Sequence, residues 1–314
     1  MRLAAVDIGS NTVHALVVEV AGDKLEDVGH FVEMPSLGAE VARSGRLGEA
    51  KIAEAVAALR SVVDQARAVG YENLVAGATE AVRRAADQAE LLQRCSAAIG
   101  IPVHLISPER EAQLSFAGVA GGHAVRKQWL MVDLGGGSTE LVVAHHHHIE
   151  AWRSLPIGSG MLANKHLSDP PSQGEREALR SEAVALLKDA PECDPSRMVA
   201  TGGTASNLPR VVSPNRPPVV LSRHALLRAA NLLDRAPAAE LQQRYLLRPG
   251  RVQAMRGGVE VLLLLLDWAG LDRLHVSLEG LRQGMIMANL ALGEDWYRDQ
   301  PPAMPVTKPE AAGL

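Results

Sequence analysis

The hydrophobic pattern of the first twenty residues predicts two strands joined by a tight turn. Residues 2–8 and 13–20 are mostly apolar and rich in β-branched side chains, and small or polar residues separate them, as in a β-hairpin. The same pattern returns over residues 129–143, where an apolar run, a glycine turn and a second apolar run follow one another. Both copies share Asp-x-Gly-(Ser/Gly)-x-(Ser/Thr), which indicates that the chain is internally duplicated, with one hairpin opening each half.

The segment between the two hairpins alternates between the helical and the strand period. Apolar positions recur at helical spacing over residues 49–69, and Gly70 follows as a C-cap. Short apolar runs at 74–78 and 103–106 predict strands, and the Ser-Pro pair at 107–108 predicts the N-cap and first residue of another helix. Strands that alternate with helices are typical of an α/β protein.

The second half continues the alternation after its hairpin. A strand is expected over residues 149–156, a glycine-rich loop over 200–204 and a helical stretch over 222–268. We place the boundary between the halves near Gly121-Gly122. The residues after Gln300 include four prolines among scattered polar residues, so we expect a disordered tail.

Composition narrows the class of protein. The chain has 314 residues, which suggests about two domains, and aromatic residues make up only 3%, so its core must consist mainly of Ala, Val, Leu and Ile. The longest apolar run near the C-terminus covers residues 261–266, far short of a membrane span, and Asp7 interrupts the N-terminal apolar stretch too early for a signal peptide. The net charge of −4 argues against general nucleic-acid binding. Cys95 and Cys193 lie in no metal-type spacing and are expected to be ordinary buried thiols in a reducing cytoplasm.

The glycine turns are the first candidate chemistry. A glycine-rich turn between strands exposes successive backbone N–H groups that can bind phosphate oxygens. One such turn is weak evidence, since hairpins need glycine anyway, but two copies facing each other across a cleft are stronger. Asp7 and Asp133 directly precede the two turns, where carboxylates can hold Mg²⁺, and residues 201–204 (Thr-Gly-Gly-Thr) form a third loop of this kind.

These three elements, in this order, resemble the actin/hexokinase/Hsp70 superfamily. Further motifs narrow the resemblance to the exopolyphosphatase/guanosine pentaphosphate phosphohydrolase (Ppx/GppA) family from Met1 to about Asn289. They are Asp-Ile-Gly-Ser-Asn-Thr at 7–12, Thr-Glu-Ala-Val-Arg at 79–83, Ser-Pro-Glu-Arg-Glu-Ala at 107–112, Asp-Leu-Gly-Gly-Gly-Ser-Thr-Glu at 133–140, Leu-Pro-Ile-Gly at 155–158, Gly-Gly-Thr-Ala at 202–205 and Ser-x-x-Gly-Leu-Arg-x-Gly at 277–284.

The resemblance implies an α/β fold of two actin-like (ribonuclease H-like) domains. Each domain is a mixed sheet flanked by helices, and the active site lies in the cleft between them. We expect the domains over residues 1–122 and 123–280, a C-terminal helix over 281–298 that packs back on the first domain, and a tail over 299–314. Long members of the family carry an additional helical domain, so the chain is similar to the short, two-domain form.

Site residues follow from the same resemblance. Glu111 matches the catalytic carboxylate that deprotonates the attacking water, and Arg83 matches a phosphate-binding arginine. At a helix start Glu111 should stay ionised, although without the other motifs it would simply be a solvated glutamate. The metal positions are Asp7, Asp133 and Glu140. The phosphate-binding positions are Gly9, Ser10, Asn11, Thr12, Gly135, Gly136, Gly137, Ser138, Thr139, Gly202, Gly203 and Thr204.

The activity that the resemblance implies is an exopolyphosphatase. It would use water and Mg²⁺, or Mn²⁺ in its place, to remove terminal orthophosphate from inorganic polyphosphate, with short chains preferred. The alternative within the family is hydrolysis of guanosine pentaphosphate to the tetraphosphate, with a role in the stringent response. A sugar or acetate kinase and a non-catalytic alarmone- or polyphosphate-binding module are more remote. A cytoplasmic homodimer with no membrane or nucleic-acid partner is expected.

Some residues depart from the family pattern or carry misleading signals. Gln253 and Gln283 replace acidic residues, which should affect local packing or dimer contacts, and His14 stands where many members have Arg or Lys. The run His145 to His148 is expected in an exposed hairpin turn and not in a physiological metal site. The glycines at 158–163 only mimic a dinucleotide fingerprint.

Overall fold

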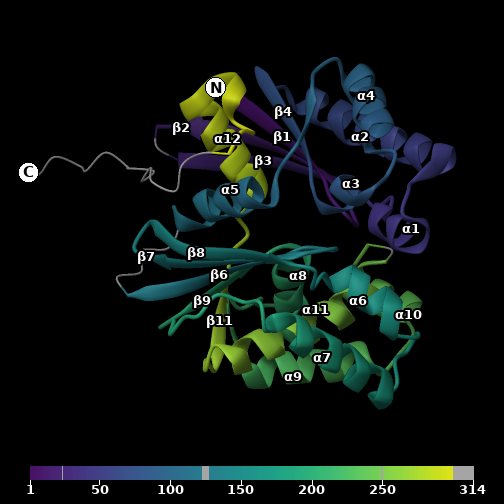
Figure 1. The fold of residues 1–314 in the computed structure, drawn as a ribbon, viewed down its shortest axis with the longest axis vertical. Coiled ribbons are helices and arrows are strands. Elements are labelled where there is room, and N and C mark those ends of the chain that lie inside the picture. Colours follow the sequence, from purple (N-terminus) through teal and green to yellow (C-terminus); the bar gives the residue numbers. More distant parts are fainter. Residues whose placement is uncertain (23, 122–126, 249, 300–314) are drawn as a thin grey trace, which may run out of the picture.

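Two mixed β-sheets, each flanked by helices, make up the chain. The computed structural model describes residues 1–22, 24–121, 127–248 and 250–299. Figure 1 shows the first sheet in the upper half of the molecule and the second in the lower half. The first sheet has the order β3-β2-β1-β4-β5 and consists of β1 (Arg2–Ile8), β2 (Val13–Ala21), β3 (Lys24–Glu33), β4 (Asn73–Ala78) and β5 (Val103–Leu105). The second has the order β10-β11-β9-β6-β7-β8 and consists of β6 (Gln128–Leu134), β7 (Thr139–His145), β8 (His148–Leu155), β9 (Met198–Thr201), β10 (Val220–Ser222) and β11 (Arg273–Val276).

The two predicted hairpins are equivalent in register. Asp7 pairs with His14 across β1 and β2, and Asp133 pairs with Glu140 across β6 and β7. A parallel strand lies beside each hairpin, β4 next to β1 and β9 next to β6. The predicted fold class is therefore confirmed, and the duplication places each Asp one residue before the end of its strand.

Helices on the outer face of the first sheet close its core. They are α1 (Leu37–Ser44), α2 (Gly48–Val69), α3 (Glu80–Arg84) and α4 (Gln88–Ile99). The helix predicted over 49–69 is α2, and the Gly70 amide donates to the Ala66 and Arg67 carbonyls at its end. Its buried side chains pack with those of β1, β2 and α4 in a cluster of small aliphatic residues, as the scarcity of aromatic residues required.

Two helices lie between the sheets. Ser107 caps α5 (Pro108–Ala120), as the sequence predicted, and α5 packs against β6, β7 and β8 and against α12 (Leu281–Leu292). Figure 1 shows α5 between the two halves, with α12 beside it. Leu114 belongs to an apolar cluster on the first sheet, whereas Phe116 packs with Trp129 on the second. Residues of α5 thus face both sheets, which suits it to position a site between them.

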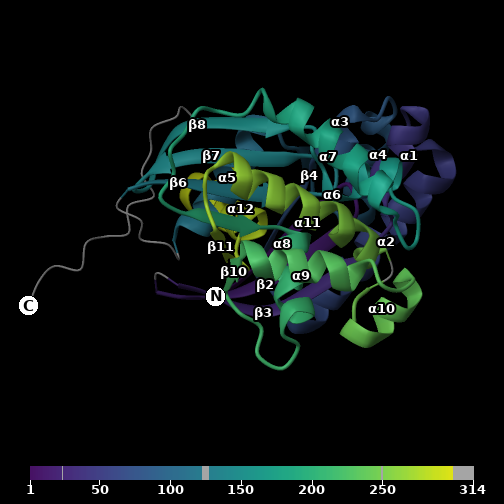
Figure 2. The same ribbon diagram turned by 90° about the horizontal axis from the view of Figure 1, so that it is seen from below.

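The remaining helices cover the far face of the second sheet (Figures 1 and 2). They are α6 (Ser159–His166), α7 (Gln173–Leu187), α8 (Gly203–Val212), α9 (Arg223–Leu233), α10 (Ala238–Tyr245) and α11 (Arg251–Trp268), and a short 3₁₀ helix, η1 (Gly293–Asp295), follows α12. The helical stretch expected over 222–268 is divided into α9, α10 and α11. Pro237, which lacks an amide hydrogen, separates α9 from α10, and Leu246 in the left-handed region ends α10.

Two predictions fall partly outside the described residues. Gly122, at the proposed domain boundary, and the tail after Asp299 are not described, so the division into domains stays a prediction. Within the described ranges, every helix is too short or too polar to cross a membrane.

Candidate functional site

The two glycine turns meet between the sheets. In each turn the first glycine donates to the carbonyl three residues later, Gly9 to Thr12 at 2.9 Å and Gly135 to Ser138 at 3.0 Å. The Asn11 side chain reaches across and lies against Gly136 and Gly160, where an added Cβ would be within 2.6 Å of its amide. The predicted facing of the two loops is therefore present in the structure.

Gly137 is the point of closest approach between the loops. An added Cβ would lie 1.9 Å from Glu80 Oε2 and 2.5 Å from Ser10 Oγ, so only glycine fits there. The Ser10 hydroxyl donates to the same Glu80 oxygen at 2.9 Å, and Arg84 donates to the other at 3.0 Å. Glu80 thus places a carboxylate against the two glycine turns, a role that the sequence analysis missed because its approach to Gly137 joins the two halves of the chain.

The start of α6 supports the second loop. Ser159 donates through its amide and its hydroxyl to the Gly135 carbonyl, and the amides of Gly160 and Met161 donate to the Gly136 carbonyl. These contacts explain the glycines that mimic a dinucleotide fingerprint. They hold the loop carbonyls on α6 and leave the loop amides as its candidate anion donors.

Of the three carboxylates predicted to hold metal, Asp133 interacts electrostatically with both Asp7 and Glu140. Asp7 lies 3.6 Å from Arg282 Nη1, Asp133 accepts from Ser115 Oγ at 2.5 Å, and Glu140 accepts from Ser154 Oγ at 2.7 Å. Burial raises the pKa of Asp7 to about 6 and, together with the charge of Asp133, that of Glu140 to about 7. Burial also raises the pKa of Asp133. Several carboxyls with perturbed pKa values in one place are typical of a functional site.

The predicted catalytic pair is in contact. Arg83 Nη1 donates to Glu111 Oε2 at 2.6 Å and to the Ile106 carbonyl at 2.8 Å, which fixes the Glu111 carboxyl. The surroundings of Glu111 oppose the ionising effect that a helix start was expected to have on it. Burial, chiefly, and the charge of Glu140 raise its pKa well above the usual value, outweighing Arg83. The first-turn argument assumed an exposed side chain, but Glu111 is only 7% exposed.

The third glycine-rich loop, residues 201–204, offers the site its backbone more than its side chains. Gly202 adopts φ +94 and its added Cβ would be 2.4 Å from the Leu134 carbonyl, so the chain can turn there only at glycine. Thr204 packs its hydroxyl against Gly258 of α11, and Thr139 donates its hydroxyl to the Ile157 carbonyl at 2.6 Å. Thr139 and Thr204 were predicted to bind phosphate, and that prediction stays open for their backbone amides.

A cluster of cationic side chains adjoins the loops. Arg251 lies against Gly203, and the pKa values of Arg251 and Arg282 are lowered by burial. His14, its pKa also lowered by burial and by these arginines, lies 3.3 Å from His30 through their ring nitrogens. Arg248 donates to the Val32 carbonyl of β3 at 2.7 Å. This local basic patch joins segments far apart in the sequence, so no motif spacing predicted it.

The two glutamine departures have packing roles. Gln253 accepts from Arg256 at 2.8 Å and donates to the Leu167 carbonyl, and Gln283 accepts from the Gly280 amide at the start of α12. These hydrogen bonds join helices and helix ends, and they do not involve the two glycine turns.

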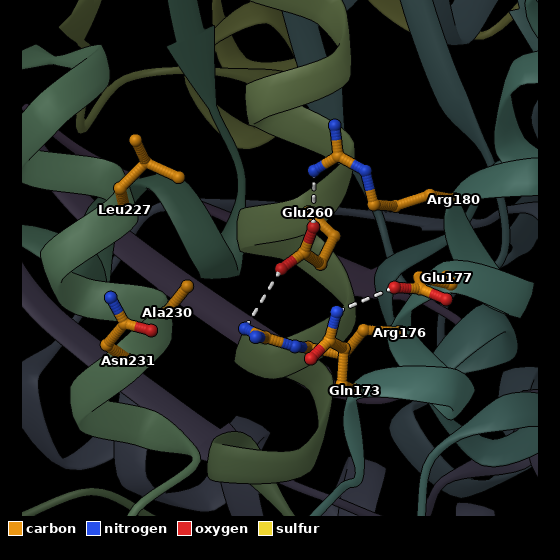
Figure 3. Close-up of a pocket in the computed structure, with 8 residues that line it drawn as sticks. All are labelled: Gln173, Arg176, Glu177, Arg180, Leu227, Ala230, Asn231 and Glu260. Atoms are coloured by element: carbon orange, nitrogen blue, oxygen red, sulfur yellow. Dashed lines mark hydrogen bonds and ion pairs between the residues drawn. The ribbon is translucent and has the colours of Figure 1, made fainter.

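Other candidate features lie apart from this site. The pocket in Figure 3 is lined by α7, α9 and α11, where Arg176 and Arg180 are paired with Glu260. His145 to His148 are exposed in the β7–β8 turn. Cys95 is buried, but Cys193 is only partly buried, because it lies in the irregular segment between α7 and β9.

Asp7, Asp133 and Glu140 offer donor atoms of the kind that a hard divalent cation binds. Asp7 Oδ1 is buried with no hydrogen-bond partner, and the donors are all carboxylate oxygens, which Mg²⁺ and Mn²⁺ prefer. Among the described side chains, no three His, Cys, Asp or Glu are grouped closely enough to hold a metal by themselves. Phosphate oxygens would therefore have to supply part of the coordination.

Comparisons with known proteins point to a single family. The model of the Ppx/GppA phosphatase family matches residues 16–292. The chain is 28% identical to exopolyphosphatase 2 of Mycobacterium tuberculosis, over 91% of this chain and 98% of that protein. It is 27% identical to a guanosine-5'-triphosphate,3'-diphosphate pyrophosphatase of Aeromonas hydrophila over 93% of this chain, but it spans only 60% of that relative's length. A crystal structure of the Aquifex aeolicus Ppx/GppA family member is similar with a TM-score of 0.76 and 28% identity, over 93% and 98% of the two chains.

Proposed function

The chain belongs to the Ppx/GppA phosphatase family, and we propose from this premise that it hydrolyses the terminal phosphoanhydride bond of inorganic polyphosphate. One observation carries the proposal: the Glu111 carboxyl is fixed by Arg83 beside Asp7, Asp133 and Glu140, next to two facing phosphate-type loops. A nucleophilic water and a phosphoryl group need little beyond positioning and charge neutralisation, which these parts can supply.

The substrate would enter with its terminal phosphate on the loop amides. The next phosphates would extend toward Arg251, Arg282 and Arg248. Burial and repulsion from the other two arginines lower the pKa of Arg251, and a polyanion would relieve this repulsion. Because this patch is compact, we propose short polyphosphate chains as the preferred substrates.

Glu111 would act as general base. In its ionised form it accepts a proton from the water while the water oxygen bonds to the terminal phosphorus. The bond from that phosphorus to the bridging oxygen breaks, and the bridging oxygen leaves with the electron pair as the new chain end. Arg83 holds the Glu111 carboxyl in place through the whole step. The raised pKa makes Glu111 a stronger base once it has lost its proton.

We propose that Asp7, Asp133 and Glu140 hold Mg²⁺ together with phosphate oxygens. Bound there, the ion would neutralise charge on the transferred phosphoryl group and orient it for in-line attack. Mn²⁺ has the same ligand preference and should substitute.

The test is orthophosphate release from polyphosphates of defined length, guanosine pentaphosphate and ATP, measured side by side with Mg²⁺ and with EDTA. The proposal expects release from short polyphosphate that stops with EDTA and returns with Mg²⁺ or Mn²⁺. Faster release from guanosine pentaphosphate would favour the family alternative instead. If none of these compounds releases orthophosphate, a hydrolytic function is overturned, and the non-catalytic binding module becomes the favoured alternative. Replacement of His145 to His148 by serine is the control that should leave the metal requirement unchanged.

The cytoplasmic homodimer expected from the resemblance is also a proposal. The burial of Cys95, whose pKa rises to about 12, supports a thiol that stays reduced and unreactive. Light scattering during size-exclusion chromatography measures the oligomeric state directly. A role in the stringent response depends on the guanosine pentaphosphate result.

A further inference from the structure

Arg110, the residue before Glu111, is a buried cation that no step of the proposed reaction uses. It is 5% exposed, and its Nε and Nη2 both donate to the carbonyl of Trp296, at 2.9 and 2.5 Å. Its third nitrogen, Nη1, donates to Gln113 at 3.0 Å. A guanidinium this deeply buried must keep its partners, because an unpaired buried charge is strongly unfavourable.

The segment that follows α12 makes two more contacts with the region carrying Glu111. The Ser107 hydroxyl, which caps α5 by accepting from the Arg110 amide at 3.0 Å, also donates to Asp299 Oδ1. The His104 ring stacks on Tyr297 with centroids 3.6 Å apart and meets Trp296 edge-on at 5.8 Å. Trp296 itself is 3% exposed, in the apolar cluster that includes Leu114 of α5. Residues 296–299 therefore contact the strand, the cap and the first turn leading to Glu111.

We propose that residues 296–299 form a C-terminal latch that holds the first turn of α5 in place, and that Arg110 is a positioning residue for Glu111. The inference rests on the proposed hydrolase function. A helix end frays unless its orphan backbone groups and side chains are tied down, and a general base must stay within hydrogen-bond reach of the water. Arg110 donates from the turn that bears Glu111 to the latch, so the latch fixes that turn through contacts separate from the one that Arg83 makes with Glu111.

Four variants test the latch. Arg110→Met removes the bonds to Trp296, Asp299→Ala removes the bond to the cap, and Asp299→Asn keeps an oxygen that can accept from Ser107. Arg2→Met is the matched control, because Arg2 also donates to a backbone carbonyl, that of Val69 at 2.9 Å, but lies at the opposite end of β1 from Asp7.

The latch predicts a fall in kcat with an unchanged KM. Arg110→Met should lose ~10-fold in kcat, within the up to about 10²-fold that an ångström of misplacement costs. Asp299→Ala should lose less, and Asp299→Asn and Arg2→Met should keep the wild-type kcat. Arg110→Met and Asp299→Ala variants that melt earlier but keep the full kcat at a temperature where they are folded would reduce the latch to a structural contact and overturn the proposal. A matching rise in KM would also overturn it, since it would place the defect in substrate binding.

Hydrogen exchange separates this proposal from the proposed function. The amides of Glu111 to Leu114 should exchange at least ~10-fold faster in Arg110→Met and Asp299→Ala than in wild type, while those of α2 keep their rates. If the wild-type chain releases no phosphate, the proposed function fails, yet the exchange experiment still decides whether the latch holds α5. If wild type is active and α5 exchanges at the same rate in all variants, the latch alone fails.

Discussion

Replacing Asp7 by asparagine should stabilise the ligand-free protein by an amount that grows with pH. The folded protein raises the pKa of Asp7 from 3.8 to about 6, chiefly through burial, so the folded state binds this proton more tightly than the unfolded state. The resulting cost to stability is absent well below pH 3.8 and complete above about pH 6. It amounts to ~1.6 kcal/mol at pH 5 and ~3 kcal/mol at pH 8. The asparagine side chain carries no charge, so the stability difference between the two proteins should widen by ~1.4 kcal/mol between these pH values.

The assay is urea unfolding in EDTA at several pH values from 5 to 8, followed by tryptophan fluorescence. Taking the difference between pH values cancels any packing or hydrogen-bond change that the amide introduces, because such a change does not depend on pH. Asp64→Asn, at a side chain of α2 that is 69% exposed, is the control and should show a flat difference. If the difference in unfolding free energy between Asp7→Asn and wild type stays constant or narrows as the pH rises, the reasoning is refuted, because burial would then not hold a proton on Asp7. The same variant should lose phosphate release, so stability and activity would move in opposite directions.

Other variants and conditions test the site around the loops. Arg83→Lys should lower kcat/KM by about 10-fold, because lysine keeps the charge but lacks the planar guanidinium, whose Nη1 alone donates to both Glu111 and the Ile106 carbonyl and whose fork suits phosphoryl oxygens. An unchanged kcat/KM would mean that Arg83 neither holds the base nor binds phosphate. Glu80→Gln should lower the KM for polyphosphate, because it removes a negative charge that lies against Ser10 and Gly137 of the glycine turns. A raised KM would instead show that the carboxylate helps substrate binding. The rate should fall as the pH drops through a range well above 4.5, because burial raises the pKa of Glu111 and only its ionised form can accept a proton; a profile that stays flat down to pH 4.5 would contradict the assigned base.

The local sequence pattern was sufficient to predict the helices and strands and some of the acidic residues of the site. The two hairpins, α2 and the cap of α5 follow from apolar periodicity and from capping residues, which act within a few positions along the chain. Asp7 and Asp133 were found because the duplicated motif puts them near the ends of equivalent strands, whereas Glu140 came from the family resemblance. Glu111 and Arg83 needed the family resemblance, since nothing in their spacing shows that they touch.

The features of the site that the sequence did not predict depend on tertiary contacts. Glu80 approaches Gly137 only because the two halves pack together, and Arg251 reaches Gly203 from α11, which lies far along the chain, so no sequence period encodes either approach. Thr204 shares the motif of a phosphate loop, yet its side chain turns toward α11 because Gly258 leaves room for it there. The effect of burial on Glu111 was missed for the same reason, because the neighbours of α5 that bury this carboxyl, and so raise its pKa, come from distant parts of the chain.

The most direct test of the account is orthophosphate release from short polyphosphate in water enriched in oxygen-18, with wild type compared with Glu111→Gln. Wild type should release orthophosphate carrying one oxygen-18 atom, because water attacks the terminal phosphorus. Glu111→Gln should release it about 10²–10⁴-fold more slowly while it still binds the chain. Unlabelled orthophosphate, or an equal rate in Glu111→Gln, would contradict hydrolysis of the terminal phosphate by this site.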